Sequence, residues 1–169
     1  MLTSEFDFAL PDHLIAQHPA PRGTSRLLVL GAGDSLEHTS IAELPRLLRP
    51  GDLLVVNDTR VIPARLFARR AGSGGRVELL LVERLDGLTW SCLARPGRKA
   101  KPEAVLELSE GLSATVVGKE ADGRHRVRFS EPIEPHLDAL GAVPLPPYIK
   151  RPADSEDRHD YQTIFAAAP

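Results

Sequence analysis

Residues 49–65, RPGDLLVVNDTRVIPAR, carry the strongest fold signal in the chain. Pro50-Gly51 ends whatever precedes it, and residues 53–56 form a short apolar run typical of a strand buried on both faces of a sheet. Four polar residues follow directly: Asn57, Asp58, Thr59 and Arg60. Open α/β sheets bind ligands at the carboxyl ends of their strands, so we expect a ligand site here. A tight turn held by hydrogen bonds from side chains to the backbone explains Asn57 to Thr59 equally well.

The composition is that of an ordinary globular protein. The chain has 169 residues, 42% of them hydrophobic, which is enough for one domain or two small ones. No apolar run reaches the ~20 residues of a membrane span, and the N-terminus lacks the features of a signal peptide. We therefore expect a cytoplasmic protein with no membrane association. The single cysteine, Cys92, excludes an internal disulfide, and the six histidines lack ligand spacing, so we expect no metal.

The N-terminal region mixes short helices and strands. Pro11 is placed to start a helix that runs to Ala16, since the first helical position needs no N–H. Residues 26–30 and 35–39 read as two strands, with a hairpin loop at residues 31–34 between them. A further short helix is expected from Pro45 to the break at residues 50–51.

Short strand-like runs dominate the middle of the chain, at residues 65–69, 77–83, 88–94, 104–108, 112–118 and 125–129. Glycine-containing turn sequences separate them, including the GSGG at residues 72–75. This regular alternation predicts a small closed sheet or barrel. We expect an α/β fold that is β-rich in this chain: an α/β domain begins at residues 1–62, a β-barrel is inserted at 63–147, and the α/β domain resumes, incomplete, at 148–169.

The segment after the expected barrel has a stiff backbone. A short helix at residues 135–140 is followed by VPLPPYIK at residues 143–150, in which three prolines favour an extended chain. This segment either presents Tyr148 and Lys150 to a ligand or serves as a plain linker. Residues 154–160 are strongly polar and expected to be exposed, and residues 161–168 are apolar and compatible with a helix.

Two groups of basic residues are candidates for contact with nucleic acid. The net charge of −2 argues mildly against such binding, so any contact needs a local patch. Such groups are more often solvated loops. One group lies near the fold-determining stretch and the other in RPGRKAKP: Arg60, Arg65, Arg69 and Arg70, and Arg95, Arg98, Lys99 and Lys101.

Several segments resemble one enzyme family in the family's own order. They are GDLLVVNDTRVIPARL at 51–66, FDFALPDHLIAQHPA at 6–20, SRLLVL at 25–30, VPLPPYIKR at 143–151 and DYQTIFA at 160–166. Together they are similar to the S-adenosylmethionine:tRNA ribosyltransferase-isomerases of queuosine biosynthesis. Relatives in that family continue through a further motif that lines the active site. We therefore expect a missing C-terminal half, and little or no activity from these 169 residues alone.

The resemblance implies a reaction as well as a fold. Such an enzyme moves the ribosyl moiety of S-adenosylmethionine onto 7-aminomethyl-7-deazaguanine in a tRNA anticodon, giving epoxyqueuosine and releasing adenine and methionine. S-adenosylmethionine is then a consumed cosubstrate and no recycled cofactor is needed. The partner is the tRNA that carries this base, and we expect the protein to be a monomer.

This chemistry needs a base, a group that stabilises charge on the departing adenine, and a pocket for the nucleoside. Asp58 is the candidate base or amine-orienting group, and Arg60 the candidate for charge stabilisation; a structural salt bridge between the two is the alternative. Tyr148 and Tyr161 are candidates for stacking on a base, although half-buried tyrosines usually only pack. The remaining candidate substrate-binding residues are Asn57, Thr59, Arg65 and Lys150.

Two other classes of protein fit parts of the sequence. A non-catalytic RNA-binding β-barrel predicts aromatic residues on strand faces, where Trp90 and Phe129 are the candidates. A purely structural domain predicts that residues 57–60 are buried and fully paired within the protein.

Overall fold

The structure is a computed structural model that describes residues 2–166. The chain divides into two compact units. The first comprises Met1–Arg60, Pro146–Pro152 and Gln162–Pro169, and the second comprises Val61–Leu145 and Ala153–Tyr161. Each unit is therefore built from segments far apart in the sequence.

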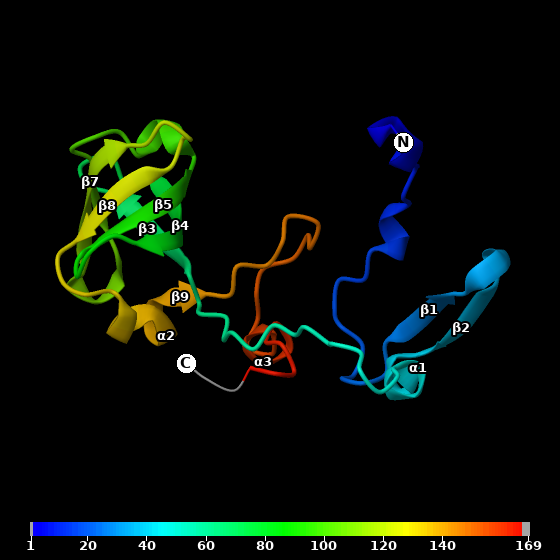
Figure 1. Ribbon diagram of the computed structural model, residues 1–169. Helices are drawn as coiled ribbons and strands as arrows, with labels where there is room; N and C mark the ends of the chain where they lie inside the picture. The colour runs from blue at the N-terminus through cyan, green and yellow to red at the C-terminus, as the bar shows by residue number, and fades with distance from the viewer. Residues whose placement is uncertain (1, 167–169) are drawn as a thin grey trace. The chain divides into compact units, whose positions relative to one another are not determined.

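The second unit is a closed antiparallel barrel, seen in Figure 1 around the labels β3 to β8. Around the barrel, neighbouring strands follow the order β3–β4–β5–β8–β7–β6, and β6 pairs with β3 to close the ring. The six strands are β3 (Arg65–Arg70), β4 (Arg76–Arg84), β5 (Thr89–Arg95), β6 (Val105–Glu107), β7 (Ser113–Lys119) and β8 (His125–Phe129). The predicted β-rich fold with a closed barrel is confirmed.

Alternation of side chains along the strands fills the barrel interior. In β8, His125, Val127 and Phe129 are buried while the residues between them are exposed. Leu66 of β3 and Leu79 of β4 have no exposed surface and meet the β8 side chains in one hydrophobic core. Because side chains of a strand alternate between faces, these strands place their intervening polar residues on the outer surface of the barrel.

A short helical passage follows the barrel and ends in a two-residue strand. The 3-10 helix η7 (Glu134–His136) leads into α2 (Leu137–Leu140), and β9 (Gly141–Ala142) then pairs with the start of β3. Gly141 is packed so tightly that a Cβ atom there would lie 2.0 Å from the carbonyl oxygen of Pro63. Only glycine fits this close approach of two backbones.

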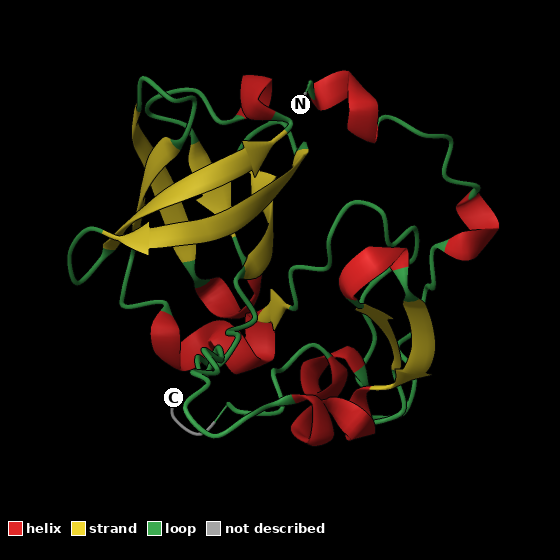
Figure 2. Ribbon diagram, turned by 45° about the vertical axis from the view of Figure 1, so that its right-hand side comes forward, coloured by secondary structure: helices red, strands yellow, loops and turns green. Residues whose placement is uncertain are grey.

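The remaining elements are short (Figure 2). A two-stranded antiparallel ribbon, β1 with β2, confirms the predicted hairpin, and Pro45 lies in the first turn of α1. The elements of the first unit are η1 (Thr3–Phe6), η2 (Asp12–Leu14), β1 (Arg26–Leu30), η3 (Ala32–Asp34), β2 (Leu36–Ser40), η4 (Ile41–Glu43) and α1 (Leu44–Leu47); the second unit adds η5 (Gly97–Lys99), η6 (Ser109–Gly111) and α3 (Asp157–Asp160). Within residues 2–166, no helix is long and apolar enough to cross a membrane.

The prediction of a buried strand at residues 53–56 is wrong in this structure. The segment has no regular secondary structure, and Leu53 and Val55 are 89% and 83% exposed. An apolar run becomes a strand only when a neighbouring strand takes up its N–H and C=O groups. No strand within the described residues pairs with this segment, so its hydrophobic sequence alone does not order it.

Three smaller expectations also need correction. The helix expected from Pro11 to Ala16 is only the 3-10 turn η2, because Ile15 already has an extended backbone and ends it. Asp157, expected to be exposed, is buried at the start of α3 and accepts a hydrogen bond from the backbone N–H of Asp154. The apolar run at residues 161–168 forms no helix as far as residue 166, and its last two residues lie outside the described residues.

Candidate functional site

The polar residues after the apolar run form a turn held by Asn57. Its Oδ1 atom accepts hydrogen bonds from the backbone N–H and the hydroxyl of Thr59, at 3.0 and 2.5 Å. The backbone oxygen of Asn57 accepts a hydrogen bond from the Thr163 hydroxyl at 2.9 Å. Thr163 in turn accepts one from the backbone N–H of Phe165 at 3.2 Å. Two segments 106 residues apart are thus joined at this turn.

Asp58 and Arg60 lie in this turn with their side chains open to solvent. The salt bridge between them, given above as the alternative to a catalytic role, is absent: within residues 2–166, neither forms a hydrogen bond or ion pair through its side chain. Both side chains are exposed, and an ion pair between exposed groups contributes little, so no strong attraction holds the two charges together. Both groups are free to meet a ligand, and a purely structural role for residues 57–60, which required burial, is not what the turn shows.

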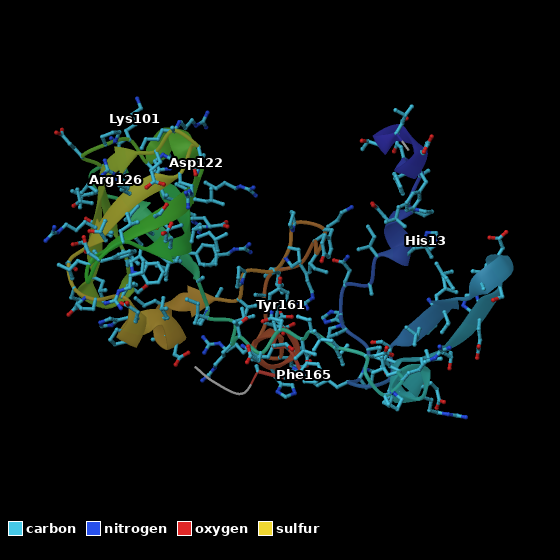
Figure 3. All side chains as sticks on the ribbon, viewed as in Figure 1. His13, Lys101, Asp122, Arg126, Tyr161 and Phe165 are labelled. Carbon is cyan, nitrogen blue, oxygen red and sulfur yellow. The ribbon has the colours of Figure 1, made fainter. Side chains whose placement is uncertain are left out.

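A hollow with a volume of 420 Å³ lies between the N-terminal segment and the stiff proline-rich segment. Figure 3 marks His13, one of its lining residues, on the N-terminal segment. The lining residues come from two parts of the chain that the first unit brings together: Asp12, His13, Ile15 and Gln17, and Tyr148, Lys150 and Arg151.

Gln17 connects the two walls of this hollow. Its Nε2 atom donates to the backbone oxygens of Ile15 and Tyr148, both at 3.2 Å. Its Oε1 atom accepts from the backbone N–H of Lys150 at 2.7 Å, and its own backbone oxygen accepts from Arg151 Nε at 3.0 Å. The side chain and the carbonyl of Gln17 therefore hold two backbone groups, at Tyr148 and Lys150, and the side chain of Arg151.

Two groups in the hollow could contact a ligand: the ammonium group of Lys150, which is ion-paired, and the exposed ring of Tyr148. Lys150 Nζ lies 2.7 Å from Asp12 Oδ2, and both side chains are largely exposed. Tyr148 is 56% exposed, so much of its ring surface is available for contact. An exposed ring beside a lysine suits a nucleoside, because every base offers a face for stacking.

Two of the sequence-predicted site residues, Arg65 and Tyr161, belong to the barrel unit instead. Arg65 donates to the backbone oxygen of Leu145 at 3.0 Å, and its Nε atom forms an ion pair with Glu78 at 3.1 Å. These contacts engage its guanidinium within the barrel. Tyr161 ends α3 and is 38% exposed. Asn57 and Thr59 thus contact each other within the first unit, whereas Arg65 and Tyr161 belong to the second.

Comparison with known proteins decides the family. The profile described as "Queuosine biosynthesis protein" matches residues 3–169. The chain belongs to this family. It is 51% identical to the S-adenosylmethionine:tRNA ribosyltransferase-isomerase of Rhodospirillum rubrum, over 95% of this chain and 47% of the relative. It is 50% identical to the protein of the same name from Anaeromyxobacter sp. (strain K), over 100% of this chain and 51% of the relative.

A protein of solved structure is also similar in sequence to this member of the family. The crystal structure of the S-adenosylmethionine tRNA ribosyltransferase from Thermotoga maritima shares 48% sequence identity, covering 75% of this chain and 44% of that one, with a TM-score of 0.38. The chain spans about half the length of the curated relatives it matches.

Sequence reasoning missed three residues that build the site of this queuosine family member: Asp12, Gln17 and Thr163. All three lie inside segments that resemble the family, yet none carries a motif with its own mechanism. Gln17 is recognisable as a polar residue directly after the apolar residues Leu14, Ile15 and Ala16, but its partner Lys150 is 133 residues away. Only the fold brings these two positions together.

The described residues hold no cluster of three or more histidine, cysteine, aspartate or glutamate side chains arranged for a metal ion. Cys92 is fully buried in the barrel, and burial, followed by the nearby charge of Glu120, raises the pKa of its thiol to about 12. A thiol in this state is neutral and inert. The groups that the candidate site presents are the carboxylate, guanidinium, amide, ammonium and phenol groups described above.

Proposed function

We propose that this chain forms part of an S-adenosylmethionine:tRNA ribosyltransferase-isomerase. In this proposal the ribosyl moiety of S-adenosylmethionine is transferred to 7-aminomethyl-7-deazaguanine in a tRNA anticodon, within queuosine biosynthesis. S-adenosylmethionine is consumed as a cosubstrate, and no recycled cofactor takes part. The proposed setting is the cytoplasm, with the protein acting as a monomer.

The observation that carries the proposal is the hollow held together by Gln17. The N-terminal and proline-rich segments are both among those that resemble the family, and the structure folds them against each other around one open space. Family membership over residues 3–169 supports the same reading. Substrate sites are usually concave pockets, and here two segments that resemble the family line the same hollow.

The proposed roles rest on which groups are exposed to solvent. Asp58 is the candidate general base or amine-orienting group, because its carboxylate is exposed and makes no ion pair within residues 2–166. Arg60 is the candidate for stabilising charge on the departing adenine. Tyr148 is the better placed of the two tyrosines for stacking, since it lines the hollow, and Lys150 is placed beside it for contact with a phosphate or carboxylate.

A non-catalytic RNA-binding barrel receives less support. That alternative relied on Trp90 and Phe129 as stacking residues, and both are buried inside the barrel, at 8% and 1% exposure. Buried rings cannot accept a base. A non-catalytic barrel would also give no role to the hollow that Tyr148 and Lys150 line in the first unit.

The test uses the chain joined to the part of the Rhodospirillum rubrum relative that it does not cover. Incubation with S-adenosylmethionine and tRNA bearing 7-aminomethyl-7-deazaguanine should release adenine and attach the ribosyl group to the tRNA. Unmodified tRNA is the matched control and should give neither product. Absence of adenine release from a folded, full-length protein would refute the proposal.

A further inference from the structure

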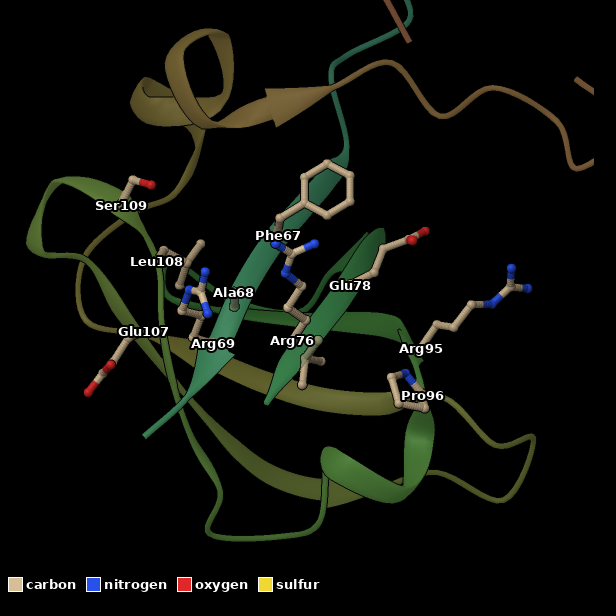
Figure 4. A pocket seen from close by; sticks show the side chains of 11 residues that line it. Phe67, Ala68, Arg69, Arg76, Glu78, Arg95, Pro96, Glu107, Leu108 and Ser109 are labelled. Atoms are coloured by element: carbon tan, nitrogen blue, oxygen red, sulfur yellow. The ribbon is translucent and has the colours of Figure 1, made fainter. Parts of the chain in front are cut away.

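A second hollow, with a volume of 610 Å³, lies on the outer surface of the barrel (Figure 4). Strands β3 and β4 run across it, the end of β5 borders one side, and the end of β6 borders the other. Its exposed side chains include Phe67, Arg69, Arg76 and Arg95. We refer to this surface as the barrel groove. None of its residues takes part in the candidate site described above.

The barrel groove gathers arginines that are distant in sequence. Arg69 and Arg95 come from the two separate basic groups seen in the sequence, and Arg76 lies on the strand between them. The register places Arg69 directly opposite Arg76 on the neighbouring strand. Figure 4 shows their side chains on the same side of the sheet.

Like charges directly opposite each other destabilise a pair of strands. Within residues 2–166, neither Arg69 nor Arg76 forms a side-chain hydrogen bond or ion pair, and the same is true of Arg95. Of the two glutamates at the barrel groove, Glu78 is already paired with Arg65 at 3.1 Å. Three arginines therefore face only one uncommitted carboxylate, that of Glu107. The groove therefore carries an excess of positive charge, which an anionic ligand would balance.

An exposed aromatic ring stands beside these arginines. Phe67 is 60% exposed, while its neighbours Leu66 and Ala68 are buried in the core. It lies opposite Glu78 and two residues before Arg69, on the same outer face. A phenylalanine ring exposed to water next to guanidinium groups is the combination by which proteins hold single-stranded nucleic acid, with phosphates on the cations and a base on the ring.

We propose that the barrel groove binds a single-stranded stretch of RNA, with a phosphate held between Arg69 and Arg76 and a base stacked on Phe67. The choice of RNA as the occupant rests on the proposed function, which needs a tRNA substrate. An acidic protein segment would satisfy the arginines, but it would leave the ring of Phe67 without a flat partner. The aromatic ring therefore favours nucleic acid over peptide.

The experiment measures binding of a fluorescein-labelled anticodon stem-loop RNA to the full chain, at several salt concentrations from 50 mM upward. The double variant Arg69→Gln/Arg76→Gln should bind about tenfold or more weakly, with a shallower dependence on salt, because two phosphate contacts are lost. Phe67→Leu should weaken binding by about 5-fold or more with an unchanged salt dependence, because stacking is lost and charge is not.

The matched control is Lys101→Gln/Arg126→Gln, which removes the same charge from exposed barrel residues outside the groove (Figure 3). It should bind RNA close to normally. Equal weakening by the control and by the arginine variant would overturn the proposal, as would the absence of RNA binding at 50 mM salt. So would weakened binding of polyglutamate by the arginine variant with unchanged binding of RNA.

The same variants separate this inference from the proposed function. RNA binding that depends on Phe67, Arg69 and Arg76 supports the groove even if the full-length protein releases no adenine. Normal adenine release together with RNA binding that is indifferent to these residues supports the enzyme and refutes the groove.

Discussion

The backbone N–H of Lys150 donates a 2.7 Å hydrogen bond to the side-chain oxygen of Gln17, 133 residues earlier in the chain. The same glutamine donates to the backbone oxygen of Tyr148. A proline-rich segment has few backbone N–H groups that can form hydrogen bonds. The bonds to Gln17 therefore fix the positions of Tyr148 and Lys150. The hollow of the candidate site therefore depends on a residue with no reactive group of its own.

Replacing Gln17 by alanine should release the proline-rich segment. Each hydrogen bond contributes about 0.5–1.5 kcal/mol, and the variant loses three of them. Hydrogen exchange at the Lys150 amide is the measurement, and exchange should become faster in Gln17→Ala. Gln17→Glu, which keeps the acceptor for Lys150, should retain more protection. Equal protection in both variants would show that other contacts hold the segment.

Gly141→Ala should destabilise the barrel unit. A Cβ atom at this position would meet the backbone oxygens of Pro63 and Leu137 at 2.0 and 2.6 Å, so β3 and β9 would have to separate. Such overpacking costs about 1–3 kcal/mol. Gly87→Ala is the control, since a Cβ there meets nothing within 4 Å. The midpoint of urea unfolding should fall for the first variant and not for the second.

Asp58→Asn tests the proposed base. Asp58 is exposed and unpaired within residues 2–166, so the substitution should change the free energy of unfolding by less than about 0.5 kcal/mol. In the chain joined to the remainder of a relative, the single-turnover rate of adenine release should fall about 10²–10⁴-fold. A near-normal rate would remove Asp58 from catalysis, and a large loss of stability would make it a structural residue.

His125 should make the barrel less stable in mild acid. Burial, followed by the charge of Lys119, lowers the pKa of this imidazole below its ordinary value near 6.5. The unfolded chain then binds a proton that the folded one does not, so stability decreases as the pH falls from about 6.5 through the lowered pKa. His125→Gln should reduce the difference in unfolding free energy between pH 7.5 and 5.5.

The control for this pH effect is His38→Gln, which removes an exposed imidazole from β2. An identical reduction by both substitutions would refute the special role of His125. An unchanged pH dependence in His125→Gln would also refute it.

Cys92 should resist thiol reagents until the protein unfolds. Its side chain has no exposed surface, and its pKa is raised to about 12. At pH 8, Ellman's reagent should react with the native protein far more slowly than with protein in denaturant, where one thiol per chain should be counted. Rapid labelling of the native state would indicate that the β5 region of the barrel opens readily.

The barrel was predictable from the amino-acid sequence because its signals are local. Alternating residues and glycine turns specify each strand and hairpin, so the runs at residues 65–69 and 125–129 became β3 and β8 almost without change. The family was readable for the same reason, since contiguous segments carry it. Phe67 could have been found too, because it stands between two residues, Leu66 and Ala68, that face the core.

Only the tertiary structure decided the features that depend on contact between residues far apart in the sequence. Residues 53–56 have the composition of a buried strand, yet they are exposed because strand formation requires a second strand to accept the hydrogen bonds. The Gln17–Lys150 contact and the facing pair Arg69 and Arg76 arise from chain crossings and strand register. Local sequence sets what a segment prefers, whereas hydrogen-bond and charge partners are chosen by which segments the fold brings together.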